Sequence, residues 1–275
     1  MSNNDNPPSI NNFSAADLKK QMAISVGTHS PQLEVILCKS GRSVLVKPLK
    51  VREKKELLKA LESKSEIIIN KALDDILELY VIASDGEEFN PRDLSIQERY
   101  QLLVYIRAAN GDKMTKIVHQ CPKCEHVNKD IEFNIVQDLN VKVYEEPKNG
   151  KVVMLCNGKV EVHFDVIYRK DEVQAEEYIK KNKLKTMTDR LVVMVASSVR
   201  DVFFIGEKSN RQEVSFKDFK EKIDFIEDLG TSELNTLSAA INQLDFGVKM
   251  PFNFHCTNCD YEEKQEVGIT VFFIS

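Results

Sequence analysis

Apolar residues recur at helical spacing in several parts of the chain. One such stripe consists of Ile69, Ala72, Leu73, Ile76, Leu77 and Tyr80. The i, i+3, i+4, i+7 spacing places these side chains on one helix face, so it predicts an amphipathic helix. Ser95 followed by Glu98 has the form of a capping box and predicts a helix that runs to about Ala109. Further helices are expected over 52–63 and 170–181, after Ser215 as a cap, and from Thr231.

Elsewhere the apolar period changes to two, which is typical of a strand with one buried face. The alternating positions are Ile131, Phe133 and Ile135, and later Val267, Ile269, Val271 and Phe273. Each of these runs follows a C-x-x-C motif. Helices and short hairpins in this order predict an α+β fold.

The two halves of the chain repeat the same order of elements. Residues 35–41 match 153–158, and each match leads into a second apolar strand and a charged helix. Each half then closes on a helix, a glycine (Gly111 or Gly247), a short strand and a C-x-x-C motif. The wider spacing in the second half indicates an insertion around 203–219. Two unrelated segments with a similar order of elements would give the same pattern, so this alternative stays open.

These matches predict three parts of the chain. The first is a flexible N-terminal arm over 1–30. The second and third are a repeat unit over 31–147 and another over 148–275, each ending in a C-x-x-C zinc-knuckle hairpin. The two hairpins are expected to meet at one four-cysteine zinc ribbon.

Composition narrows the class of protein without naming a function. The chain of 275 residues is 42% hydrophobic and 29% charged, with a net charge of -5. A mildly acidic chain is not expected to bind nucleic acid chiefly by neutralising phosphates. No apolar run reaches about 18 residues, so no membrane span is expected. The polar N-terminus lacks the pattern of a signal peptide, and synthesis in the cytoplasm is expected.

The cysteine spacing carries the most specific chemistry. Cys121 and Cys124 form one C-x-x-C pair, and Cys256 and Cys259 form another, each between two predicted strands. Two such knuckles complete the tetrahedral thiolate shell that structural zinc prefers, so one zinc ion per chain is predicted. A closed shell leaves no position for water, and the ion is therefore expected to be structural.

Other interpretations of the cysteines are less consistent with their setting. A thioredoxin-like redox pair needs a helix that starts at the first cysteine, whereas strands follow here. Free structural thiols would make the two matching pairs a coincidence. The flanking His119, His126 and His255 could replace a ligand.

Glu125 and Asp260 stand where knuckles often have glycine. Asp tolerates the left-handed backbone region better than Glu, so the first knuckle is expected to be looser than the second.

No catalytic constellation is evident. Phosphate-binding glycine loops, the H-E-x-x-H motif and the G-x-S-x-G motif are absent from the sequence. Adjacent carboxylates such as Asp74 and Asp75 point in different directions and are interpreted as solvated charge. The chain is therefore not expected to be an enzyme.

The order of motifs resembles a known family. An extended segment over 44–49 leads into a charged helix over 52–58, a helix over 94–108, a glycine, a strand and C-x-x-C. The second C-x-x-C precedes a strand that ends at 271–273. Over residues 35–275 this order is similar to the baseplate hub and hub-assembly proteins of contractile-tailed bacteriophages (myoviruses).

The resemblance implies a structural role in the central hub of a phage tail baseplate. It implies other tail and hub proteins as partners, with the arm over 1–30 as a segment that clasps one of them. It also implies a location in the virion, and in the host cytoplasm during assembly.

Two alternatives stay open. A zinc-ribbon adaptor that binds nucleic acid or the transcription machinery would draw on Lys113, Lys116, Lys123 and Lys129 around the first knuckle. A redox protein would use Cys121 and Cys124.

Overall fold

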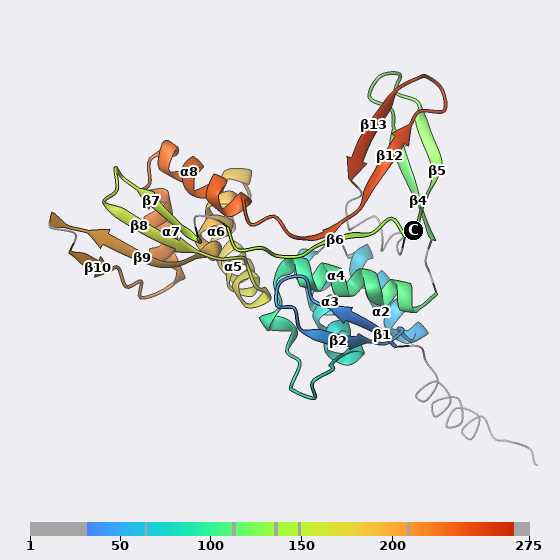
Figure 1. Ribbon diagram of the computed structural model, residues 1–275, viewed down its shortest axis with the longest axis horizontal. Coiled ribbons are helices and arrows are strands. Elements are labelled where there is room, and N and C mark those ends of the chain that lie inside the picture. Colours follow the sequence, from blue (N-terminus) through green and yellow to red (C-terminus); the bar gives the residue numbers. More distant parts are fainter. Residues whose placement is uncertain are drawn as a thin grey trace, which may run out of the picture.

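A computed structural model of the chain describes residues 32–63, 65–111, 114–134, 137–147, 150–207 and 210–266. The predicted arm over 1–30 lies outside these residues. So do Ile135 and the predicted strand positions over 267–273. The described residues form three lobes, which Figure 1 shows as one at the left end of the long axis and two, one above the other, at the right. We call residues 32–111 the first lobe, 150–246 the second lobe, and 114–134 with 250–266 the hairpin lobe.

The first lobe places three helices against a small antiparallel sheet of order β1-β2-β3. Its strands are β1 (Leu33–Ile36), β2 (Ser43–Val46) and β3 (Val81–Ala83). Its α-helices are α2 (Val51–Glu62), α3 (Glu66–Tyr80) and α4 (Ile96–Ala109), and the 3-10 turn η1 (Pro91–Asp93) precedes α4. The predicted stripe of α3 does face the core, where Leu77 is fully buried. The predicted capping box also forms, because Ser95 and Glu98 exchange hydrogen bonds at the start of α4.

The second lobe has its own core and a larger sheet of order β10-β9-β8-β7. Its strands are β7 (Val152–Leu155), β8 (Val160–Phe164), β9 (Val199–Ile205) and β10 (Arg211–Glu213), and its helices are α5 (Arg169–Asn182), α6 (Met187–Ser198), α7 (Phe219–Glu227) and α8 (Thr231–Asn242). The range of the predicted insertion, 203–219, holds the end of β9, β10 and the start of α7. The predicted cap at Ser215 is wrong: Asp218 accepts the Glu221 N–H and begins α7.

The two larger lobes share an order of elements. In each, a hairpin (β1–β2 or β7–β8) is followed by two helices and by a strand that pairs antiparallel with the second strand of the hairpin. The second lobe differs in that β10 extends its sheet and α7 precedes its last helix. Mixed helices and small antiparallel sheets confirm the α+β class.

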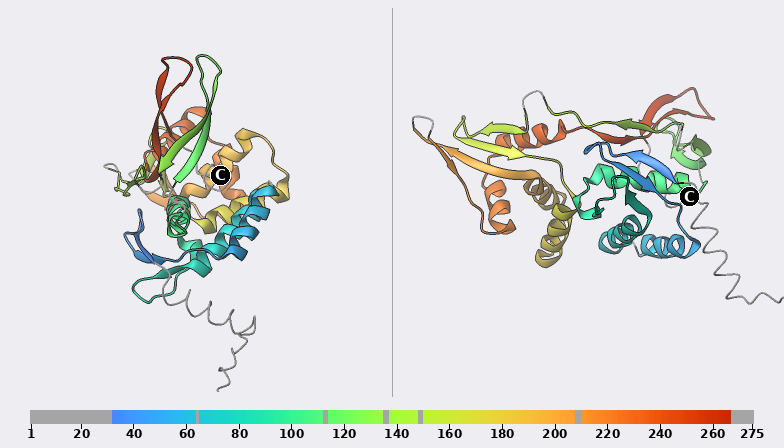
Figure 2. Two further views of the ribbon diagram at one scale, coloured as in Figure 1. Left: turned by 90° about the vertical axis from the view of Figure 1, so that its right-hand side faces the viewer. Right: turned by 60° about the horizontal axis from the view of Figure 1, so that its bottom comes forward.

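The hairpin lobe consists of two hairpins that are far apart in sequence. They are β4 (Met114–Gln120) with β5 (Val127–Asn134), and β12 (Pro251–His255) with β13 (Glu262–Glu266). Figures 1 and 2 show them side by side. At their base Ile117 and Phe133 pack with Met250 and with Val104 of α4. The whole second lobe is therefore inserted between two hairpins that pack on each other.

A two-stranded ladder connects the lobes. Strand β6 (Asn140–Lys142) pairs antiparallel with β11 (Gly247–Lys249), which passes along the start of α4. Gly247 has φ +103°, and a Cβ at this position would come within 2.7 Å of the Gln97 Cβ atom. Only glycine meets both conditions without strain. Gly247 therefore allows the ladder to lie directly against the first lobe.

Across the described ranges, no helix combines the length and the apolar character needed to cross a membrane.

Candidate metal centre and the junction between lobes

The structure brings all four predicted cysteines together at the tip of the hairpin lobe. Cys121 and Cys124 lie in the β4–β5 turn, while Cys256 and Cys259 lie in the β12–β13 turn. Their Sγ atoms lie within 4.8 Å of one another. Cys121 and Cys256 are buried and the other two are half-buried, so one side of the cluster faces solvent. We call this cluster the clasp.

Distances within the clasp suit a tetrahedral metal and exclude a disulfide. The Cys121 and Cys259 sulfurs are 3.7 Å apart, and those of Cys124 and Cys256 are 3.6 Å apart. A disulfide requires about 2.05 Å. Zinc bonded to sulfur at about 2.3 Å gives a tetrahedron whose sulfur–sulfur edges are about 3.8 Å. Both short edges join one hairpin to the other, so a metal here would hold the two together.

Equivalent hydrogen bonds shape the two cysteine turns. The Cys121 N–H donates to the His126 carbonyl at 2.9 Å, and the Cys256 N–H donates to the Tyr261 carbonyl at 3.0 Å. Glu125 follows the first pair with φ +59°, in the left-handed region, whereas Asp260 has no positive φ. A side chain with a Cβ is strained in that region. The strain therefore falls on the first turn alone.

Two asparagines that the sequence analysis missed support the clasp from opposite hairpins. Asn128 of β5 is buried, and its Oδ1 accepts the Thr257 N–H at 2.8 Å and the Thr257 hydroxyl at 2.9 Å. Its Nδ2 lies 3.7 Å from the Cys256 sulfur. In return, Asn258 directs its backbone N–H to the Cys256 sulfur and its Nδ2 to the Cys124 sulfur. Such donors orient thiolates and reduce their mutual repulsion.

The surroundings change the acidity of the thiols in opposite directions. Burial opposes ionisation of Cys256, but N–H donors from Asn258 and Asn128 outweigh it and lower its pKa to about 6. For Cys259, burial and the three neighbouring thiols raise the pKa to about 12. Without a cation the cluster cannot hold four negative charges close together. A divalent cation would supply the missing compensation.

None of the three flanking histidines belongs to the clasp. The His119 ring packs edge-on against Phe254 with ring centroids 4.4 Å apart. His255 is exposed and its Nδ1 lies 2.9 Å from the Glu262 carboxylate. His126 contributes its backbone carbonyl to the turn. Among the described residues, the four cysteines are the only group of three or more potential ligands placed to share one ion.

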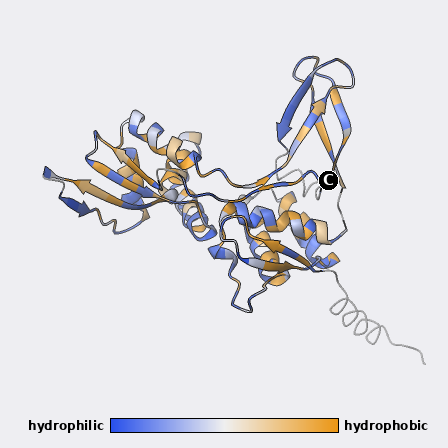
Figure 3. Cartoon of the chain, in the orientation of Figure 1, coloured by the Kyte–Doolittle hydropathy of each residue, from blue (hydrophilic) through white to orange (hydrophobic). Residues whose placement is uncertain are grey.

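The clasp cysteines make up most of the small buried core at the tip of the hairpin lobe. The core there consists of Phe254, Cys121 and Cys256, so two of its three buried residues are cysteines. Figure 3 shows a hydrophilic β13, which carries only Glu, Lys and Gln side chains. So small an apolar core gives little stability without a crosslink or a metal.

A second cluster joins the first and second lobes with buried charges. Arg99 of α4 donates to Asp74 of α3 at 2.7 Å and to Glu172 of α5 at 2.8 Å. Arg169 donates to the other Asp74 oxygen at 2.8 Å and to Glu176 at 2.9 Å. Both arginine side chains are at most 4% exposed. We call these five residues the ion-pair junction. The expectation that Asp74 is solvated is therefore wrong, because its partners come from elements distant in sequence.

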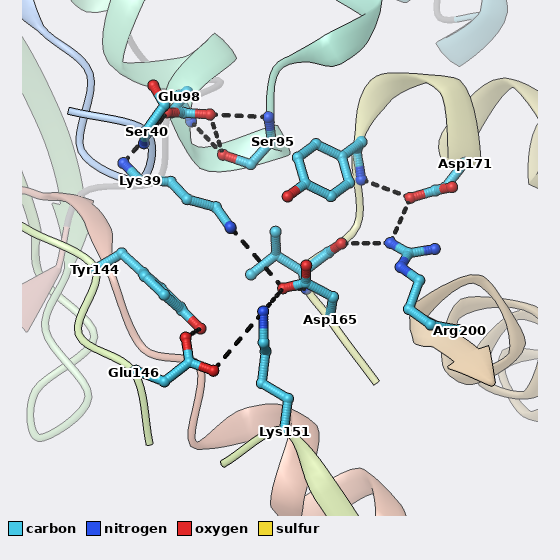
Figure 4. A network of polar contacts seen from close by, with 12 residues as sticks. Lys39, Ser40, Ser95, Glu98, Tyr144, Glu146, Lys151, Asp165, Asp171 and Arg200 are labelled. Carbon is cyan, nitrogen blue, oxygen red and sulfur yellow. Dashed lines mark hydrogen bonds and ion pairs between the residues drawn. The ribbon is translucent and has the colours of Figure 1, made fainter. Parts of the chain in front are cut away.

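Figure 4 shows a further polar network beside this junction. The Lys39 Nζ, from the β1–β2 turn, lies 4.0 Å from Asp165 and 4.7 Å from the centre of the Tyr144 ring. Burial disfavours its charge, but Tyr168 and Asp165 outweigh this effect and raise the Lys39 pKa. Asp165 also binds Lys151 at 3.2 Å. One lysine of the first lobe is thus held by residues of the second lobe and of the connecting segment.

The two remaining cysteines lie outside the clasp. Cys38 is buried after β1, and burial next to Glu98 raises its pKa to about 12, which makes it an unreactive thiol. Cys156 has φ +51° in the β7–β8 turn. Of the lysines around the first knuckle, Lys113 lies outside the described residues, and Lys123 and Lys129 are exposed.

Comparison with known proteins identifies the family. The family model described as T4 bacteriophage base plate protein matches residues 30–274, a range that includes all three lobes and both cysteine pairs. Comparisons with curated proteins and with solved structures gave no match. The match confirms the predicted relation to phage baseplates, and it gives the chain a structural place in the virion tail, among other tail proteins. The chain belongs to the family of T4 bacteriophage base plate proteins.

Proposed function

We propose that this protein is a structural component of the central hub of the baseplate, and that one zinc ion bound by Cys121, Cys124, Cys256 and Cys259 stabilises it. The observation that carries the zinc assignment is the convergence of four sulfurs within 4.8 Å of one another, from two turns 132 residues apart, with both of the short distances between the turns close to a tetrahedral edge. A closed four-thiolate shell has no open position for substrate. The ion is structural, and the protein performs no catalysis.

In this proposal the metal sets the orientation of the hairpin lobe. The base of that lobe packs on α4 through Val104, and its tip is held by the clasp. A rigid projection of this kind offers other hub proteins a defined surface. Assembly takes place in the host cytoplasm, and the protein then stays in the virion.

We also propose that the chain arose by duplication of a unit, with one copy over 31–147 and the other over 148–275. The shared order of hairpin, two helices and antiparallel third strand supports this division. The equivalent backbone bonds of the two cysteine turns support it as well. Under this proposal each copy supplies half of the zinc site.

Metal analysis of the purified protein tests the zinc assignment. Mass spectrometry under native conditions is expected to find one zinc per chain, and Cys156→Ser, as the matched control, should retain it. Two ions or none would contradict a shared site.

Mass spectrometry of hub and peripheral subassemblies from infected cells tests the location of the protein. Recovery with the peripheral parts alone would refute the proposed place in the hub.

The nucleic-acid alternative is tested on the same protein. An adaptor of that class would bind heparin at low salt through the lysines of the first knuckle. The proposal predicts no retention, since the chain carries a net charge of -5.

A further inference from the structure

A cationic pocket lies where the end of α5 and the start of α6 meet the start of α3. Its volume is about 410 Å³, and Lys180, Lys183, Lys185 and Arg190 line it. Among the described residues that line the pocket, one is acidic: Glu176, which is engaged by Arg169 at 2.9 Å and by Asn70 at 2.6 Å. Its charge is therefore committed to the ion-pair junction.

The three lysines of the pocket are exposed, and none has an ion-pair partner within the part of the chain that the structure describes. A concentration of positive charge on a chain with a net charge of -5 is a local feature that attracts an acidic group. The pocket also has apolar walls, formed by Ile67, Ile179 and Leu184. A nucleic-acid backbone gains little from such walls, whereas an acidic peptide with apolar side chains gains from both features.

The exposed face of α6 continues from this pocket. Met187 is 84% exposed, Leu191 is 49% exposed and Met194 is 39% exposed. These positions and Arg190 share one face, because their spacing follows the helical repeat. Methionine adapts its shape to different partners and is frequent on surfaces that bind helices.

One turn after Arg190, the same face reaches a second pocket. Met194 and Ser198 line this space of about 390 Å³, together with Ile96 and Gln97 of α4 and residues of α8 and β11. The Gln97 Oε1 atom is buried and has no hydrogen-bond donor among the described residues. A buried acceptor without a donor is costly, and an N–H group from an incoming segment would satisfy it.

We propose that the α6 face, defined by Met187, Arg190, Leu191 and Met194, docks an acidic amphipathic segment of a neighbouring tail protein. Acidic side chains of this segment enter the lysine pocket, and its apolar side chains cover the α6 face and enter the second pocket. Because both pockets also contain residues of the first lobe, the bound segment would contact the first and second lobes together. This inference rests on the proposed place in the baseplate but not on the zinc ion.

Photo-crosslinking in assembled tails tests the inference. A benzophenone amino acid replaces Met187 in the full chain, and crosslinked peptides from purified baseplates are sequenced by mass spectrometry. The expected product is a segment of another tail protein rich in Asp, Glu and large apolar residues. Crosslinks to nucleic acid or to a second copy of this chain would overturn the inference, as would the absence of any crosslink.

Charge reversal supplies the matched comparison. Lys180→Glu with Lys185→Glu should reduce the crosslink at least about tenfold, since it replaces attraction by repulsion. Lys55→Glu with Lys59→Glu makes the same change in net charge on the exposed surface of α2, and should leave the crosslink unchanged. Equal yields from both double variants would overturn the proposed charge complementarity.

A second variant separates docking from folding. Leu191→Ser removes an exposed side chain, so it should leave thermal unfolding unchanged while lowering the crosslink yield. An unchanged yield would contradict apolar docking on α6.

Prior quantification of the protein in the baseplates distinguishes the docking proposal from the proposed place in the baseplate. Absence of the protein would overturn its place in the baseplate together with the docking, whereas its presence without a crosslink would overturn the docking alone.

Discussion

The clasp and the ion-pair junction both join segments that are distant in sequence, but they differ in how their charges are compensated. The junction sets two guanidinium groups against three carboxylates, and every one of these five residues has a partner of opposite charge at hydrogen-bond distance. The clasp sets four sulfurs against neutral N–H donors from Asn128 and Asn258. In the proposed zinc complex, the compensation for the thiolates comes from the bound cation.

Because of this difference, the junction and the clasp hold their lobes in place under different conditions. Ion pairs between residues of the chain itself hold the first and second lobes together as soon as both have folded. Under the proposed zinc assignment, the clasp holds the tip of the hairpin lobe only when metal is bound, and structural zinc contributes roughly 10–16 kcal/mol in small zinc peptides. The order of the hairpin lobe should therefore respond to metal supply, whereas the contact between the larger lobes should not.

The largest effect is expected from breaking the clasp. Cys256→Ser removes one ligand, and we expect loss of the zinc and rapid hydrogen exchange in β4, β5, β12 and β13. The cores around Leu77 and Val162 should stay protected, because they are separate from the tip. Mass spectrometry with hydrogen–deuterium exchange measures both regions. Full protection of the hairpins in the variant would show that the metal does not hold them.

Breaking the junction should give the next largest effect, on the opposite part of the molecule. Asp74→Ala removes the carboxylate that Arg99 and Arg169 share, but each arginine keeps one carboxylate, so we expect a loss smaller than the cost of about 3–5 kcal/mol for a buried pair that is broken outright. Denaturant unfolding measures the loss. The zinc content should stay at one per chain, and a concurrent loss of zinc would contradict the independence of the two sites.

Glu172 offers a further test of the junction, because its raised pKa makes the stability of the folded protein depend on pH. Burial raises the Glu172 pKa, although Arg99 and Arg169 oppose the shift. A raised folded-state pKa means that the folded protein binds the proton at higher pH than the unfolded chain. Glu172 thus contributes stability that grows as the pH falls through its folded pKa toward the ordinary value of about 4.3. Glu172→Gln should lack this gain in unfolding experiments at pH 4 to 7, and an identical pH dependence would refute it.

Removing the support of the clasp should have an intermediate effect on metal affinity. Asn128→Ala deletes the acceptor for Thr257 and the donor to the Cys256 sulfur. Loss of such support typically weakens metal binding 10–100-fold. Competition with a chromophoric chelator measures the change. Asn253→Ala, at an exposed position of β12, is the control and should bind zinc like the wild type.

The smallest effect compares the two cysteine turns directly. Glu125→Gly should stabilise the protein by up to about 1 kcal/mol, because it relieves the left-handed strain at φ +59°. Asp260→Gly should give no gain, since Asp260 has no such strain. Thermal unfolding of the two variants measures the contrast, and an equal shift in both would contradict it.

The sequence was sufficient for features that depend on local spacing. The α3 stripe, the Ser95–Glu98 capping box and the two cysteine pairs follow from short-range rules of helices and turns. The α+β class follows from the same rules. The cysteines could be grouped as one cluster because few other arrangements give each C-x-x-C pair a partner.

Features that depend on distant partners could not be predicted. Asp74 meets Arg99 from 25 residues away and Arg169 from 95 residues away, so no local signal separated it from its neighbour Asp75. Asn128 is out of phase with the inward positions Ile131 and Phe133, because the register of the β4–β5 ladder shifts between them, so the alternation gave no signal for it. The β6–β11 ladder is short and lacks a periodic pattern. Ser215 and Asp218 are both suitable N-cap residues. Helix α7 begins at Phe219, one turn later than predicted, so Asp218 is the cap.

The separation of the two cysteine turns also has a consequence for biosynthesis. Cys124 and Cys256 are 132 residues apart. At the usual 5–20 residues per second, the ribosome needs on the order of 10 s to make the intervening chain. During that time the first turn can offer a metal only two thiols. A complete four-sulfur shell can form only after the inserted lobe has been synthesised and the second hairpin has reached the first.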